Sequence, residues 1–224
     1  MPTSLVHTLQ FAALDPVRPV DDLLRLALVV ARKLNVSEIE EWISSELNGY
    51  GSNTELPSYR VVKGELKGID PDTGNLLPIV LRQPNIAAAY GKRRLTQSIS
   101  EIEHLVAACG RDGEVYSRTH AEAENLLREH LGSRPPTQIG VVVYAPQIRT
   151  VLSMVRNRVI EWATKLEQMG ILGDGITFTQ QEQEKATHVT NITIMGSVHG
   201  SQIQQNAAHA EQTTTPPAVD LAGC

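Results

Sequence analysis

One glutamate, Glu46, occupies a position where the sequence predicts a buried side chain. It continues an apolar stripe at helical spacing that is formed by Ile39, Trp42 and Ile43. A buried carboxylate needs a cationic partner, because an unpaired charge inside a protein is strongly destabilising. The group could form a structural ion pair, or it could act as the acid or base of a catalytic site. We favour the ion pair, since structural ion-pair networks also place carboxylates in such surroundings.

The other residue types form no recognisable catalytic or metal-binding pattern. The seven histidines are scattered, and no two of them lie four residues apart with a glutamate in between. The two cysteines, Cys109 and Cys224, are not at zinc-binding spacing and are too few for a disulfide framework, so we expect reduced thiols. The glycine-rich stretch 170–175 lacks the lysine of a phosphate-binding loop. We therefore predict no metal site and no cofactor.

Composition narrows the class of protein further. Apolar residues make up 41% of the 224 residues, which is typical of a globular chain. The longest apolar run, 23–31, is interrupted by Arg25 and is far shorter than a membrane span, and no export signal is visible. A formal charge of −5 and an aromatic content of 4% make a nucleic-acid partner unlikely on these grounds. We expect a cytoplasmic protein that does not insert into membranes.

Periodicity predicts the elements that must position Glu46. Apolar residues recur every three or four positions in several segments, and Ser37 with Glu40 and Ser98 with Glu101 match the capping-box pattern. Trp42 and Trp162 lie on such stripes and should be largely buried. The expected elements are helices over 20–34, 37–48, 98–108, 117–131 and 146–168, a strand over 139–144, and a β-hairpin over 58–81. The predicted fold class is therefore α+β: a predominantly helical domain over residues 1–178 with a small antiparallel β-hairpin.

The composition changes after residue 178. Residues 179–187 are polar and predict a linker, with a frayed extension as the alternative, and residues 207–224 predict a disordered tail. Between them, 188–206 has high β propensity and no Asp, Glu, Lys or Arg, as segments that stack between chains do. We predict a β-strand motif for self-association, with a hairpin packed on its own domain as the alternative. The residues proposed to form the contact are Ile192, Ile194, Val198, Gln202, Ile203 and Gln204.

Two parts of the chain carry a resemblance to a known family. The first is EWISSELNGY at 41–50 followed by LPSYRVVKG at 56–64, and the second is VRNRVIEWA at 155–163 followed by Leu166-Glu167. Together they resemble the AbiTii-type abortive-infection proteins, with similarity over about residues 5–175. The resemblance implies defence against phage, in which infected cells stop growing or die, and it transfers no active site.

The resemblance also supplies partners for Glu46. Arg60, Arg156 and Arg158 lie in or beside these segments and are the candidate members of a structural ion pair. Two hypotheses follow. The first is a non-catalytic defence protein that acts as a homo-oligomer and contacts a phage or host protein. The alternative is a toxin-like enzyme, a nuclease or nucleotide hydrolase, with its site around Glu46, Arg60 and Arg156. A dry ion pair without a pocket would favour the first, and a convergent acidic pocket would favour the second.

Overall fold

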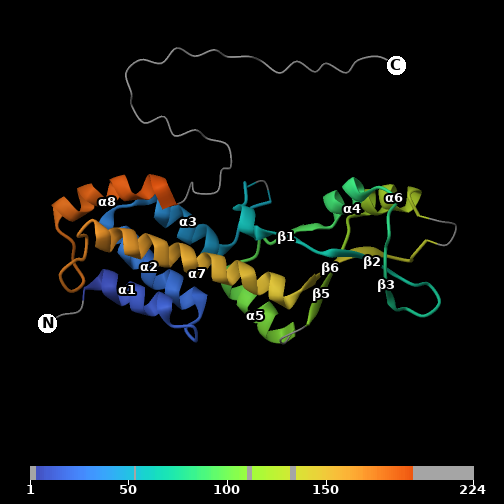
Figure 1. Ribbon diagram of the computed structural model, residues 1–224, viewed down its shortest axis with the longest axis horizontal. Helices are drawn as coiled ribbons and strands as arrows, with labels where there is room; N and C mark the ends of the chain where they lie inside the picture. Colours follow the sequence, from blue (N-terminus) through green and yellow to red (C-terminus); the bar gives the residue numbers. More distant parts are fainter. Residues whose placement is uncertain (1–3, 53, 110–112, 132–134, 194–224) are drawn as a thin grey trace, which may run out of the picture.

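The chain folds into an elongated body with a purely helical end and an opposite end in which the strands lie beside further helices (Figure 1). The computed structural model describes residues 4–52, 54–109, 113–131 and 135–193. Its helices are α1 (Leu5–Leu14), α2 (Val20–Leu34), α3 (Ser37–Asn48), α4 (Pro84–Tyr90), α5 (Ile99–Cys109), α6 (Ala121–Glu129), α7 (Ala145–Gln168) and α8 (Gln180–Thr193), with a short 3-10 turn, η1 (Ser58–Arg60). Its strands are β1 (Val61–Lys63), β2 (Glu65–Ile69), β3 (Leu76–Pro78), β4 (Lys92–Arg94), β5 (Glu114–Arg118) and β6 (Ile139–Tyr144).

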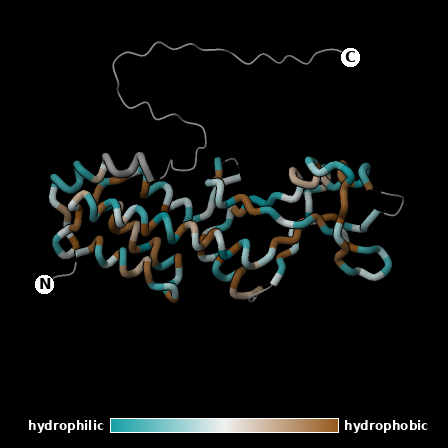
Figure 2. Tube along the Cα trace, viewed as in Figure 1, coloured by the Kyte–Doolittle hydropathy of each residue, from teal (hydrophilic) through white to brown (hydrophobic). Residues whose placement is uncertain are grey.

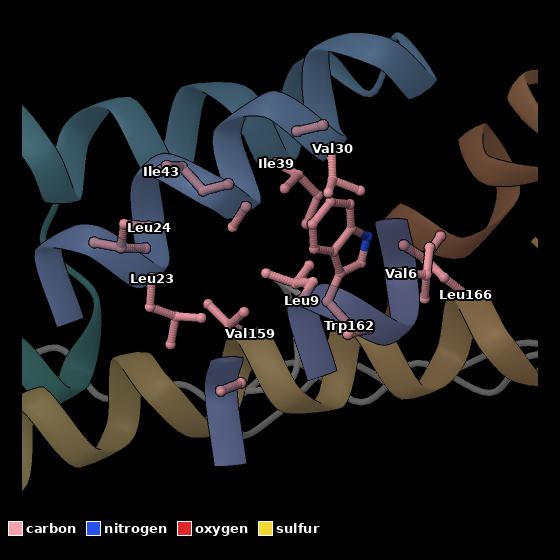
Figure 3. Close-up of a cluster of buried hydrophobic side chains, with 14 of the residues drawn as sticks. Val6, Leu9, Leu23, Leu24, Val30, Ile39, Ile43, Val159, Trp162 and Leu166 are labelled. Carbon is pink, nitrogen blue, oxygen red and sulfur yellow. The ribbon is translucent and has the colours of Figure 1, made fainter. Parts of the chain in front are cut away.

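The helical end is built from α1, α2, α3, α8 and the second half of α7. Helix α2 begins with Asp21 and Asp22 and ends with Arg32 and Lys33, which suits the helix dipole at both ends. Asn35 then adopts a left-handed conformation and ends the helix. The apolar stripes of these helices meet in one core, in which Trp162 is completely buried (Figure 3). Trp42 is 8% exposed, so the predicted burial of both tryptophans is confirmed.

The other end contains two small antiparallel sheets. The larger has the strand order β3-β2-β6-β5, and Leu66 of β2 pairs with Val141 of β6. The smaller joins β1 to β4. Every residue of β6 except Tyr144 is buried, so the compact apolar run predicted as a strand is the centre of a second core. Helix α7 starts directly after β6 and contributes to both cores, which makes it the common support of the two ends.

The predicted α+β class and predominantly helical character are confirmed, with local differences. Within 58–81 the β2–β3 hairpin is present, but β1 instead pairs with β4, a strand that was not predicted. The segment 117–131 begins as the end of β5 and is helical only over α6. Helices α1 and α4 were not predicted, although α1 buries Leu5, Leu9 and Ala12 at helical spacing. No helix in the described ranges combines the length and apolar character needed to cross a membrane.

The prediction of a polar linker over 179–187 is wrong. Gln180–Thr193 forms α8, which packs on the helical end through Ala186, a completely buried residue (Figure 1). Its N-terminus carries a capping box, in which the Glu182 carboxylate accepts from the Thr179 amide at 2.8 Å and the Glu182 amide donates to the Thr179 hydroxyl at 3.2 Å. The first part of α8, residues 180–187, is hydrophilic, which is why apolar periodicity did not reveal it (Figure 2).

The predicted β-strand motif over 188–206 is therefore wrong in its first part. Residues 188–193, including Ile192, continue α8 because the cap at Thr179 starts a helix that nothing interrupts. The other residues proposed for self-association lie outside the described residues: Ile194, Val198, Gln202, Ile203 and Gln204. The predicted disordered tail over 207–224 also lies outside them.

Candidate functional site

Glu46 lies in the last turn of α3 with its side chain fully buried. Its carboxylate forms an ion pair with Arg60, whose Nη2 donates to Oε2 and whose Nε lies 3.5 Å from Oε1. The Tyr50 and Tyr59 hydroxyls both donate to Oε1, at 2.7 and 2.5 Å. Charge-assisted bonds of this kind are the stronger class of hydrogen bond in proteins. Both carboxylate oxygens are therefore occupied by donors from the chain itself.

Arg60 is equally buried and uses most of its donors. Its Nη1 donates to the backbone oxygens of Leu95 at 3.2 Å and Gln97 at 2.7 Å, between β4 and α5. Its guanidinium also stands 5.1 Å from the centre of the Tyr50 ring. The planar fork of an arginine can satisfy a carboxylate and two carbonyls at once, which a lysine could not do. Arg60 thus ties α3 to the chain segment that leads from the small sheet into α5.

A second layer of aromatic side chains surrounds this pair. Trp42 Nε1 donates to the Tyr59 hydroxyl at 2.9 Å, and the Arg158 guanidinium lies 4.6 Å from the centre of the Tyr59 ring. Burial, followed by the negative charge of Glu46, raises the pKa of both Tyr50 and Tyr59 above the usual value. Both phenols therefore remain protonated donors at neutral pH. We call the ion pair with Trp42, Tyr50 and Tyr59 the Glu46 network.

Arg156 does not belong to the Glu46 network. Its guanidinium donates to the backbone oxygens of Ala13 at 3.2 Å and Asp15 at 2.7 Å, and to that of Arg18. These three carbonyls belong to the end of α1 and the loop that leads to α2. Of the three candidate arginines, Arg60 pairs with Glu46, Arg158 contacts the Tyr59 ring, and Arg156 holds this loop in place.

A cleft of about 640 Å³ lies beside this loop. Its walls are the α1–α2 loop, the start of α2, one face of α5 and the first half of α7. At its base the Glu103 carboxylate accepts from the backbone amides of Val20 at 2.6 Å and Asp21 at 3.4 Å. Helix α2 has no side-chain cap of its own, because Pro19 occupies the N-cap position. Glu103 of α5 therefore supplies the negative charge that this helix end favours.

Neither site resembles a metal centre. Among the described residues there is no group of three or more His, Cys, Asp and Glu side chains that could hold a metal ion. At the Glu46 network the carboxylate is enclosed, so a substrate has no path to it without local unfolding. At the cleft, Glu103 is already committed to two backbone amides.

Comparison with known proteins places these features in a family. A model of the AbiTii family matches residues 4–191. The chain belongs to the AbiTii family. Searches of curated proteins and of solved structures each returned no significant match. The AbiTii match contains both the Glu46 network and the cleft, and it extends into α8, so α8 belongs to the family domain.

Sequence reasoning located Glu46 in this AbiTii protein and named Arg60 among its candidate partners, but it missed the two tyrosines that donate to the Glu46 carboxylate. The role of Tyr50 had no periodic signal, because α3 ends at Asn48 and Gly49 turns the chain before Tyr50. The sequence contained no direct sign that Glu103 caps α2. It showed only that Pro19, which precedes α2, has no side chain that could cap the helix, so that the cap had to come from another element. The capping box predicted at Ser37 and Glu40 does not form, because Val36 is the N-cap and the Glu40 carboxylate accepts from Arg32 Nε at 2.8 Å.

Proposed function

We propose that this AbiTii protein is a cytoplasmic bacterial defence protein that acts by self-assembly and partner contact. Abortive infection is the activity that the family name carries. The observation that supports a non-catalytic role is the enclosure of Glu46. Its two oxygens accept from Arg60, Tyr50 and Tyr59, and its exposed fraction is 0%. A carboxylate that is fully paired and shielded from solvent is suited to holding a fold together.

The same contacts weigh against the enzyme alternative at this place. A catalytic acid or base must reach the reacting group within hydrogen-bond distance. Glu46 meets only side chains of its own domain, and Arg156 is bound to the backbone of the α1–α2 loop instead. The three residues of the suggested enzyme site are therefore not assembled around one pocket.

Self-assembly is assigned to the uncharged chain that follows α8. Residues 194–206 contain β-branched, Asn and Gln residues and no Asp, Glu, Lys or Arg, a composition that favours strand stacking between chains. Helix α8, which precedes this segment in the sequence, is docked on the helical end through Ala186. A phage or host protein is the second partner in this proposal.

The test is protection of cells against phage by the wild-type protein and three altered forms. Ile194→Lys places a charge in the assembly segment and should abolish both assembly and protection. Ile176→Lys is the matched control, because Ile176 is 67% exposed and lies in the loop before α8. A chain ending at Thr193 should behave as Ile194→Lys does, since it keeps α8 whole. Equal protection by all forms at equal protein levels would refute the assembly proposal.

A further inference from the structure

The outer face of α1 carries an unusual apolar surface. Phe11 and Leu14, three residues apart on the helix, are 68% and 65% exposed. Val17 continues the surface into the α1–α2 loop and is 86% exposed. We call these three residues the α1 ridge. Helix α1 runs along the outer edge of the helical end, so nothing in the described chain covers the ridge (Figures 1 and 2). Contiguous exposed apolar groups are a feature of interaction sites.

The cleft begins where the α1 ridge ends, because Val17 lines both. Three arginines and three acidic residues share its walls: Arg18, Arg149, Arg156, Asp21, Asp22 and Glu103. Four of them are engaged within the chain. Asp21 pairs with Arg25, Glu103 caps α2, Arg156 binds the loop carbonyls, and Arg149 also has a partner.

Arg18 and Asp22 are the exception. Both are exposed, and neither side chain forms a hydrogen bond or an ion pair within the described ranges. They have opposite charge and stand four residues apart, on either side of the start of α2. A surface with one unpaired cation beside one unpaired anion is complementary to itself under a two-fold axis. Each copy then offers its arginine to the aspartate of the other.

From this charge pattern we infer that a second copy of this chain docks here. The α1 ridges of the two copies pack against each other, and Arg18 of each copy faces the other copy's aspartate at position 22. The contact is separate from the segment after α8 and does not depend on it. In an isologous dimer both ion pairs form together. Each substitution in the surface is present in both copies and therefore changes the interface at two places.

The first experiment measures the dimer dissociation constant by sedimentation. All proteins are full-length and carry Ile194→Lys, so that the C-terminal segment does not contribute. Leu14→Lys should raise the dissociation constant at least tenfold, as expected for a central apolar contact. Lysine is chosen because a cation suits the C-terminal end of α1. Ile176 is nearly as exposed as Leu14, and Ile176→Lys should change the dimer dissociation constant by less than twofold. A monomer at all concentrations, or equal effects of both substitutions, would overturn the inference.

The second experiment reverses the charges. Arg18→Glu and Asp22→Arg should each weaken the dimer, since like charges then face each other at both contacts. A mixture of the two variants should recover the affinity. In the mixed dimer the two substituted side chains form a reversed ion pair at one contact, and the native Arg18 and Asp22 form the original pair at the other. A variant that merely folds poorly could not be rescued in this way. If mixing gives no recovery, the dimer is refuted. It is also refuted if Leu14→Lys, placed in the otherwise wild-type chain, removes phage protection but leaves the dimer dissociation constant unchanged in the Ile194→Lys background, and the surface then binds a different protein.

Discussion

Replacing Glu46 by alanine should be among the most damaging changes to this domain. The substitution leaves the Arg60 guanidinium buried with two carbonyl partners and no counter-charge. Removing one member of a buried ion pair costs about 3–5 kcal/mol. The Tyr50 and Tyr59 hydroxyls also lose their acceptor, which keeps the loss toward the upper end of that range. For a chain of this size the melting temperature should fall by roughly 6–20 °C.

Urea unfolding followed by tryptophan fluorescence measures this loss, because Trp42 and Trp162 are both buried in the native domain. Glu40→Ala is the control: it removes the Arg32–Glu40 pair, whose side chains are 60% and 37% exposed. That change should cost less than about 1 kcal/mol. The double variant Glu46→Ala/Arg60→Ala should be less destabilised than the sum of the single variants, since it leaves no lone buried charge. A cost for Glu46→Ala no larger than that for Glu40→Ala would refute the structural role.

Two further carboxylates, Glu103 and Glu182, give additional predictions. Glu103→Ala removes the cap of α2 and should cost about 0.5–2 kcal/mol in urea unfolding, whereas the exposed Glu161→Ala should change stability little. Glu182 is partly desolvated, which raises its pKa, but hydrogen bonds from the Thr179, Gly173 and Leu172 amides and from the Thr179 hydroxyl outweigh this and lower it. The ionised Glu182 carboxylate therefore contributes its full stabilisation of the folded state above pH 4.5, the usual pKa of a glutamate. This stabilisation is lost as the pH falls through the lower pKa that Glu182 has in the folded protein. When the melting temperature is measured at decreasing pH, it should fall less steeply for Glu182→Gln than for the wild-type protein. An equally steep fall for both proteins would contradict the stabilising role of the ionised Glu182 carboxylate.

Apolar periodicity predicted several of the elements that bury a continuous stripe, although it did not reveal α1. Helix α2, helix α7 and strand β6 were all found in this way, because each fills a core with its own side chains. Helix α8 was missed because, among its residues 180–187, Ala186 is the one that is buried, and polar bonds help to hold the helix, among them Gln183 Nε2 donating to the Lys33 backbone oxygen at 2.9 Å. In such a helix apolar residues do not recur every three or four positions, so the polar composition was mistaken for that of a linker.

The capping-box pattern shows how one motif can have two outcomes. Thr179 and Glu182 match it and form the cap, and the same is true of Ser98 and Glu101. Ser37 and Glu40 match it as well, but Glu40 is drawn to Arg32 at the end of the preceding helix. The local sequence cannot distinguish these cases, because the competing cation comes from another element.

The Glu46 network likewise combines a feature that the local sequence predicts, the burial of Glu46, with one that only the folded structure determines, the identity of its arginine partner. Helical spacing was enough to predict that Glu46 lies on a buried stripe, and physical chemistry then required a cation. Nothing in the spacing distinguished Arg60 from Arg156 or Arg158. Which arginine pairs with Glu46 depends on the backbone carbonyls that surround each arginine in the folded chain. The Leu95 and Gln97 carbonyls hold Arg60 beside Glu46. The Ala13 and Asp15 carbonyls hold Arg156 at the α1–α2 loop. An arginine has more donors than one carboxylate can use, so its position is determined by the carbonyls as much as by the charge. Arg60→Lys should therefore destabilise the domain nearly as much as Glu46→Ala in the same urea unfolding assay, although it keeps the charge.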